Sequence, residues 1–169
     1  MKQLSVSRKH EGLFKFIFII FFFAISLSGM AQEKTLGLRL GWGGGLSYVQ
    51  SITDDQDLEL ILSPRWGGII LTGLYERKVP LSSNSWNLFY GGGLHVGYHH
   101  RNNYVGEGFN GDPLYINLGF DLIAGIKYRF DSFPIEVSAD YKPSIELLAK
   151  RNLLLEEFGI SCRYLIFQD

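Results

Sequence analysis

Side chains of opposite character alternate along most of the chain beyond residue 35, with a period of two residues. Between Leu36 and Tyr48 the even positions carry mainly leucine, tryptophan or tyrosine, whereas the odd positions carry glycine, arginine or serine. Successive side chains of a β-strand point to opposite faces, so this pattern predicts strands with one apolar and one polar face. No helical period appears over the same residues. The sequence therefore predicts an all-β protein.

Six segments show this alternation over strand-like lengths: 36–48, 57–78, 86–98, 116–130, 135–145 and 158–166. In several of them aromatic residues stand at the ends of the apolar face with aliphatic residues between, which is typical of aromatic girdles around a lipid-facing band. Backbone polar groups in a bilayer must pair within the protein, so such strands have to close into a ring. The predicted fold is a closed antiparallel up-and-down transmembrane β-barrel. A soluble periplasmic β-sandwich, whose strands also alternate, is the alternative.

The apolar face supplies the residues that we expect at the two membrane interfaces. They are Trp42, Tyr48, Trp86, Tyr98, Phe130, Tyr141, Phe158 and Tyr164.

The segment from Asp57 to Lys78 changes phase partway, because its apolar residues move from even to odd positions. A one-residue slip transfers every side chain to the other face, so either a β-bulge near Trp66 or a turn must lie there. Connection 100–113 is long and polar and is expected outside the cell, whereas link 131–133 is short and expected in the periplasm. With six segments, only a single bulged strand over 57–78 returns both termini to the periplasm. Bacterial barrels have at least eight strands, so we expect eight, two of them short strands without an assigned position.

The first 31 residues have the pattern of a secretory signal peptide. Four basic residues come first, an apolar run covers 16–27, and small residues at Gly29 and Ala31 predict cleavage after Ala31. The apolar run is shorter than the roughly 18–20 residues of a spanning helix, which disfavours an uncleaved anchor. We expect residues 32–169 to form the outer-membrane domain of a Gram-negative bacterium.

Charge and cysteine content exclude some functions. The leader holds four basic residues and one acidic residue, so the remainder has 12 Lys and Arg against 16 Asp and Glu, a net charge of −4. This balance is not that of a nucleic-acid-binding protein. Cys162 is the only cysteine and cannot form an internal disulfide. Its position on the apolar face predicts an inert, lipid-facing side chain.

The polar face collects charged residues that a barrel would enclose in its lumen. Six are fixed positive charges and four are negative, with one histidine: Arg39, Glu59, Arg65, His95, Asp121, Lys127, Arg129, Glu136, Asp140, Lys142 and Arg163. Unpaired buried charges are costly, so we interpret this set as a paired, hydrogen-bonded plug. A charge-lined conduit for small solutes, as in a porin, is the alternative; an eight-stranded barrel is nearly filled by its own side chains.

Other candidate sites carry weaker signals. His95, His99 and His100 approach the outer rim, where an outer-leaflet lipid-modifying enzyme could use a histidine, but no partner residue is identifiable. His95 and His99 are roughly 13 Å apart along a strand, too far to share a metal ion. Glycines 43–45 and 91–93 are expected inside strands, where they make room in a tight lumen and do not form a phosphate-binding loop. We expect no catalytic residue, cofactor or metal ion.

Several stretches resemble a family of small outer-membrane β-barrel-domain proteins whose roles are mostly undefined. The matching stretches cover nearly all of the expected mature chain: 66–76, 90–97, 119–130, 136–143 and 159–164. Such barrels usually end on an aromatic residue, whereas this chain continues from Phe167 to Gln168 and Asp169. The resemblance implies an exported, membrane-inserted barrel and supplies no catalytic residue.

The sequence thus favours an integral outer-membrane protein of structural or interaction type, not an enzyme. Its expected partners are outer-membrane lipid and, during insertion, the barrel-assembly machinery. An external ligand would dock on the outer loops, above all on 100–113. The sequence identifies neither that ligand nor an oligomeric state.

Overall fold

The computed structural model describes residues 33–65, 68–81, 85–100, 114–148 and 153–167. The chain divides into two compact units, Met1–Ala31 and Gln32–Asp169, and the fold reported below belongs to the second. The expected signal peptide with its cleavage site, most of connection 100–113 and the last two residues lie outside the described ranges. Among the residues described, no helix is long and apolar enough to cross a bilayer.

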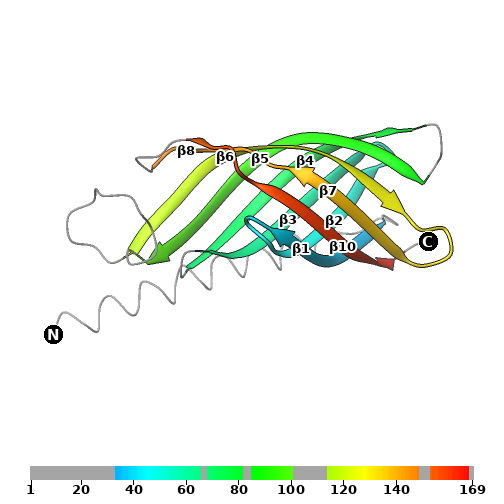
Figure 1. The fold of residues 1–169 in the computed structure, drawn as a ribbon, viewed down its shortest axis with the longest axis horizontal. Helices are drawn as coiled ribbons and strands as arrows, with labels where there is room; N and C mark the ends of the chain where they lie inside the picture. The colour runs from blue at the N-terminus through cyan, green and yellow to red at the C-terminus, as the bar shows by residue number, and fades with distance from the viewer. Residues whose placement is uncertain (1–32, 66–67, 82–84, 101–113, 149–152, 168–169) are drawn as a thin grey trace. The chain divides into compact units, whose positions relative to one another are not determined.

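The described residues form one closed antiparallel sheet (Figure 1). Its strands are β1 (Lys34–Gly41), β2 (Gly45–Thr53), β3 (Gln56–Arg65), β4 (Gly68–Pro80), β5 (Trp86–His100), β6 (Leu114–Arg129), β7 (Ile135–Tyr141), β8 (Ser144–Glu146), β9 (Leu153–Leu154) and β10 (Phe158–Phe167). Neighbours in sequence pair from β1 to β7, and β1 pairs with β10 to close the ring. The closed antiparallel barrel is therefore confirmed, and the β-sandwich alternative is wrong.

The barrel has eight strands, because two of them are interrupted. Both β7 and β8 pair with β6, at Ala124–Arg129 and at Gly119–Asp121. Likewise β10 pairs with β7, and β9 pairs with β8. In the barrel wall, β7 and β8 together form one interrupted strand. β9 and β10 together form another. We call the end of the barrel with the β1–β2 turn the outer end and the end with residues 130–134 the inner end, following the expected topology.

One missing strand lies within segment 36–48, which the alternation presents as a single strand. The chain turns between β1 and β2: Gly41 and Gly43 have φ of 117° and 79°, and the Gly44 amide donates to the Gly41 carbonyl at 3.1 Å. The ladder pairs even residues with even ones, such as Leu38 with Leu46. Cross-strand partners share a face, so the alternation continues through the turn without a break. Gly43 and Gly44 thus belong to a turn and not, as predicted, to a strand.

The other missing strand lies within segment 57–78. The bulged single strand predicted there is wrong, because β3 ends at Arg65 and β4 begins at Gly68. Their ladder pairs even residues with odd ones, such as Leu62 with Leu71. Because partners share a face, the outward residues change from even positions in β3 to odd positions in β4, the same change that a bulge would produce. Two turns were therefore missed, and together they raise the count from six to eight while keeping it even.

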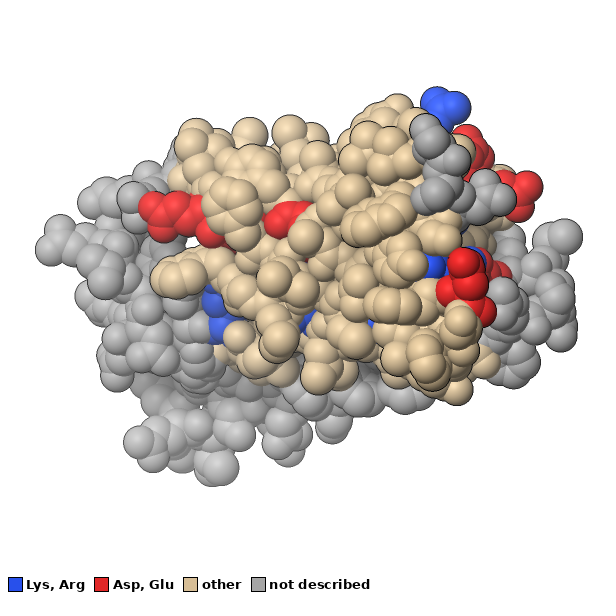
Figure 2. Space-filling view, turned by 45° about the vertical axis from the view of Figure 1, so that its right-hand side comes forward, with Lys and Arg blue, Asp and Glu red and all other residues tan. Residues whose placement is uncertain are grey.

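The barrel exposes apolar side chains and buries charged ones. Leu40, Leu122 and Ile160, which lie on the outward faces of three strands, are 67%, 63% and 64% exposed. Figure 2 shows a face on which uncharged residues cover the middle and charged ones gather mainly toward the two ends. Soluble proteins bury most of their large apolar side chains and expose their charges. This distribution is the inverse and suits a protein surrounded by hydrocarbon.

The lumen also contains a small apolar cluster formed by Ile61, Leu74, Phe89 and Ile123. Phe89 is the residue that interrupts the alternation between 86 and 98, and it is 2% exposed. It pairs with Gly125, whose missing side chain leaves the space that the Phe89 ring fills. The Lys127 ammonium lies 4.5 Å from the centre of this ring, within the range of a cation–π contact.

Candidate functional site

The eleven charged residues predicted to line the lumen lie together inside the barrel. Eight of them are buried: Arg39, Glu59, His95, Asp121, Lys127, Asp140, Lys142 and Arg163. Arg65, Arg129 and Glu136, near the two ends, are partly exposed. Each of the eleven forms at least one ion pair with another lumen residue.

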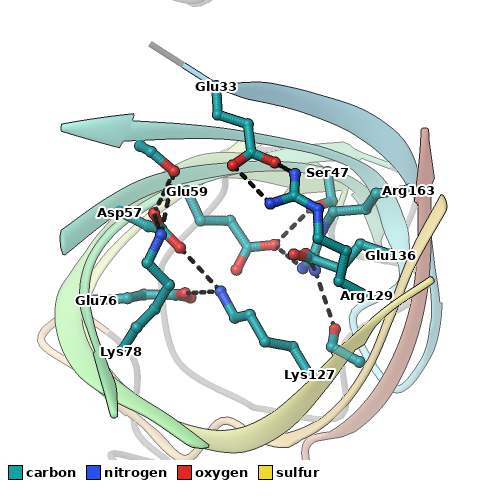
Figure 3. Close-up of polar contacts among 12 residues, drawn as sticks. Glu33, Ser47, Asp57, Glu59, Glu76, Lys78, Lys127, Arg129, Glu136 and Arg163 are labelled. Carbon is teal, nitrogen blue, oxygen red and sulfur yellow. Dashed lines mark hydrogen bonds and ion pairs between the residues drawn. The ribbon is translucent and has the colours of Figure 1, made fainter. Parts of the chain in front are cut away.

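The inner half of the lumen is organised around Arg163 of β10 (Figure 3). Its Nη2 donates to Glu59 Oε1 at 2.6 Å, and its Nη1 lies 3.2 Å from Glu136 Oε1. The Nε donates to Ser47 Oγ at 2.7 Å, and Ser47 in turn donates to Glu59 at 2.6 Å. A further bond to Ser138 at 3.0 Å engages the guanidinium. These contacts hold a buried charge with several partners, the condition under which burial is tolerated.

Lys127 forms a second centre in the same half. Its Nζ donates to Asp57 at 3.0 Å and to Glu76 at 3.3 Å. Lys78 approaches Asp57 from the other side at 2.7 Å. At the inner mouth, Arg129 pairs with Glu33. In Figure 3 these side chains extend from different parts of the wall toward the lumen.

The outer half holds a separate set of pairs. Arg39 donates to Asp140 at 2.5 Å and also reaches the backbone carbonyls of Trp42 and Gly43 in the β1–β2 turn. Lys142 lies 2.7 Å from Asp121 and 2.6 Å from Glu157. Arg39 therefore ties the turn to the lumen network.

His95 and Arg65 complete this outer set. The Nδ1 of His95 lies 2.6 Å from Asp121, and its Nε2 lies 3.3 Å from Glu146. Arg65 pairs with Glu157. His95 is therefore a buried member of the lumen network to which the sequence assigned it; the side chains of His99 and His100 are not described.

Sequence reasoning missed six charged members of the network: Glu33, Asp57, Glu76, Lys78, Glu146 and Glu157. Each lies at the same even or odd positions as the inward residues of its strand. Applying the alternation over the full length of every strand would therefore have identified them. With them the lumen holds seven Lys and Arg against nine Asp and Glu, besides His95. The six positive and four negative residues identified from the sequence are therefore only part of the network.

Inward glycines accommodate the large lumen side chains. A Cβ on Gly159 would lie 2.4 Å from the Arg39 guanidinium carbon, and one on Gly119 would lie 2.4 Å from Cε1 of His95. What space remains is small. A cavity of about 10 Å³ lies among Arg65, His95 and Lys142, and one of about 70 Å³ lies at the inner mouth. The first is about the least volume that holds one water molecule.

The predicted interface aromatics occupy the outward faces. Trp42, Trp86, Phe130, Phe158 and Tyr164 are exposed, and Tyr98 and Tyr141 are half-buried. Four of them pack on a neighbouring ring: Trp86 and Phe130 lie 4.7 Å and 4.8 Å from Tyr128, and Tyr141 lies 4.8 Å from Phe158.

Tyr48 departs from this expectation because it is 4% exposed. Tyr48 lies inside β2, paired with Leu36 and Leu60, and its hydroxyl donates to Gln50 Oε1 at 3.2 Å. Cys162 is exposed on the outward face of β10, as its parity predicted. Within the described ranges, no group of three or more His, Cys, Asp or Glu residues is arranged to hold a metal ion.

Comparison with known proteins gives a structural match. No family model and no curated protein matches the chain. The crystal structure of the N-terminal β-barrel domain of Pseudomonas aeruginosa OprF superposes with a TM-score of 0.55 at 13% identity, covering 82% of this chain and 100% of that one. The chain shares the fold of that barrel domain. A shared fold at this identity leaves function to be argued from the lumen and the surface.

Proposed function

We propose that this protein is an integral outer-membrane β-barrel of structural or interaction type, whose lumen is sealed by the charge network. The observation that carries the proposal is the inverted side-chain distribution. Exposed aliphatic and aromatic residues cover most of the outer wall, with Tyr48, Leu60 and Leu71 on it buried, and they surround an interior whose charges pair with one another. Within the described sheet every strand except the two-residue β9 has a neighbour on both sides, which removes nearly all of the open sheet edges that hydrocarbon does not tolerate.

The lumen supports a plug better than a conduit. Arg163, Lys127 and Lys142 each contact two carboxylates from different strands, so their charges are balanced within the wall. The apolar cluster around Phe89 fills the space on the β3–β6 side. A solute would have to displace several buried ion pairs at once.

The proposal includes no catalytic role. His95 is the one histidine whose side chain is described, and a carboxylate faces each of its ring nitrogens. Neither nitrogen is therefore available to a substrate as a general base. The remaining route to a specific activity is binding at the outer loops, which we propose as the surface where a partner docks.

Fractionation and gel mobility test membrane insertion. The protein should sediment with the outer membrane, and the detergent-extracted barrel should migrate differently in gels before and after boiling. Recovery as a soluble periplasmic protein contradicts the proposal.

Planar bilayer recordings test the seal and separate the plug from a small-solute channel. The purified barrel should insert without discrete conductance steps. Reproducible steps that scale with the amount of inserted protein favour the channel. Tryptophan fluorescence of the same preparation reports insertion, so that an absence of conductance caused by failed insertion is not interpreted as a sealed lumen.

A further inference from the structure

The barrel wall has unequal height at its outer end. β1 and β2 have 8 and 9 residues, whereas β5 and β6 have 15 and 16. The ladder between β1 and β10 ends at the pair Gly41–Gly159, followed by one hydrogen bond from the Trp42 amide to the Phe158 carbonyl at 3.2 Å. Beyond that pair β9 continues the wall, and within the described sheet it pairs with β8 on one side and with no strand on the other. A seam therefore separates β9 from the β1–β2 turn.

A pocket of about 140 Å³ lies at this seam. Its walls are Trp42 from the turn and the consecutive leucines 153–155, and its polar side is formed by Arg65, Glu156 and Glu157. An apolar cavity of about 150 Å³ holds a molecule of the size of benzene. The seam pocket is thus too small for a whole ligand of drug size but large enough for a short length of hydrocarbon.

The pocket opens onto the apolar outer surface. Trp42, Leu153 and Leu155 are all more than half exposed, and Phe158 and Leu40 extend the same apolar surface down the wall. On its other side the pocket ends at the Arg65–Glu157 pair, which Lys142 extends into the lumen network. The site therefore has the exposed apolar surface on one side and the lumen network on the other.

We infer that the seam pocket binds one acyl chain of an outer-leaflet lipid, along the part of the chain next to the ester. This inference rests on the proposed membrane insertion. Tryptophan residues such as Trp42 settle at the membrane interface, where the ester-proximal part of an acyl chain also lies. Trp42 and the three leucines provide the apolar contact for the chain.

Photolabelling in vesicles tests this site. The full-length barrel is inserted into phosphatidylcholine vesicles that contain a small fraction of phospholipid with a diazirine close to the ester, and labelled residues are mapped by mass spectrometry. We expect labelling of Trp42 and residues 153–155 to exceed that of the outward residues Leu38 and Ile160 several-fold. It should also saturate as the probe fraction rises. A probe with its diazirine at the terminal methyl should lose this preference.

Two variants fill the pocket, Leu154→Trp and Leu155→Trp, and each should abolish the excess labelling. Leu38→Trp is the matched control, because it adds the same side chain to the outward face away from the seam. Heat-modifiable mobility of every variant reports insertion independently of labelling. If the inserted wild-type barrel labels the seam no more than Leu38, the pocket inference is overturned while the proposed function stands. Cross-links from the seam to a second copy of the chain would also overturn it, in favour of an interface. If the wild-type barrel itself does not insert, the proposed function fails.

Discussion

Arg163 and Glu59 form an ion pair at 2.6 Å although their strands, β10 and β3, are separated in the sheet by β1 and β2. The pair therefore links parts of the wall that share no backbone ladder. Both side chains are almost fully buried, at 2% and 1% exposed. In the lumen this kind of contact, and not a continuous apolar core, connects non-neighbouring strands.

Replacing Arg163 by Met should destabilise the barrel by about 3–5 kcal/mol, because Glu59 is left buried without its counter-ion. Adding Glu59→Leu should recover part of the loss, so the double variant is less destabilised than the sum of the two single ones. Urea unfolding in vesicles, followed by tryptophan fluorescence, measures these differences. Arg77→Met is the control, since the Arg77–Asp55 pair is 3.5 Å long and exposed, and its loss should cost less than about 1 kcal/mol. Equal effects of the two Met variants would contradict a stabilising role for the lumen pairs.

Gly159→Ala should displace Arg39 from Asp140, because the three atoms nearest to the added Cβ, at 2.4–2.6 Å, all belong to the Arg39 guanidinium group. The expected loss in stability is about 1–3 kcal/mol, the usual effect of overpacking a filled interior. Gly73→Ala is the matched control on another strand, where the nearest atom would be Leu60 Cδ2 at 3.6 Å. Unfolding midpoints that fall equally for both variants would show that glycine content, and not lumen space, is what matters.

Phe89→Ala should leave a void between Ile61, Leu74 and Ile123 and remove the aromatic face under Lys127. Truncating a buried phenylalanine typically costs about 3–5 kcal/mol. Phe130→Ala, on the outward face near the inner end, should have a smaller effect because that ring is exposed. Urea unfolding measures both variants. A lower unfolding free energy for the Phe130 variant than for the Phe89 variant would contradict a filled lumen.

Leu122→Arg separates a lipid-facing surface from a water-facing one. Leu122 is exposed near the middle of β6, where an arginine facing the bilayer midplane should destabilise the barrel by about 2–4 kcal/mol. Ile52→Arg, near the inner end of β2, should cost only about 0–1 kcal/mol. The two variants are compared by folding yield in vesicles and by urea midpoint. On a water-facing surface both substitutions would be harmless, which is the result that would refute membrane insertion.

The face that each residue occupies could be predicted from its even or odd position, since every strand of a barrel wall has one lipid-facing and one enclosed side. It placed Arg39, Lys127 and Arg163 inside and Cys162 outside. Turns were harder to locate. A hairpin that pairs even residues with even ones leaves the alternation unbroken, as between β1 and β2. A hairpin that pairs even residues with odd ones shifts the alternation by one residue, as a bulge does, and this is the case between β3 and β4.

Partner choice in the lumen could not be predicted from the sequence. The pairs Arg39–Asp140, Lys127–Asp57 and Arg163–Glu59 join residues far apart in the chain. Which ends meet depends on the registers of all the ladders between them, and each register is set by a hairpin whose turn the sequence did not reveal. The even or odd position of a residue tells which face of the wall it occupies. Its height along the barrel axis follows only from the registers of the closed ring.

The ladder between β1 and β10 has a consequence for how this protein is made. It is antiparallel and aligns Leu36 with Tyr164 and Leu40 with Ile160, so the first and last strands to be synthesised are partners. Contacts of such large sequence separation form slowly, because the intervening chain must first be brought together. A chain without β10 cannot close the ring, and until β10 arrives one edge of β1 has unpaired backbone groups to which a foreign strand can bind. Closure of this barrel is thus an all-or-none event that begins only after β10 has been translated.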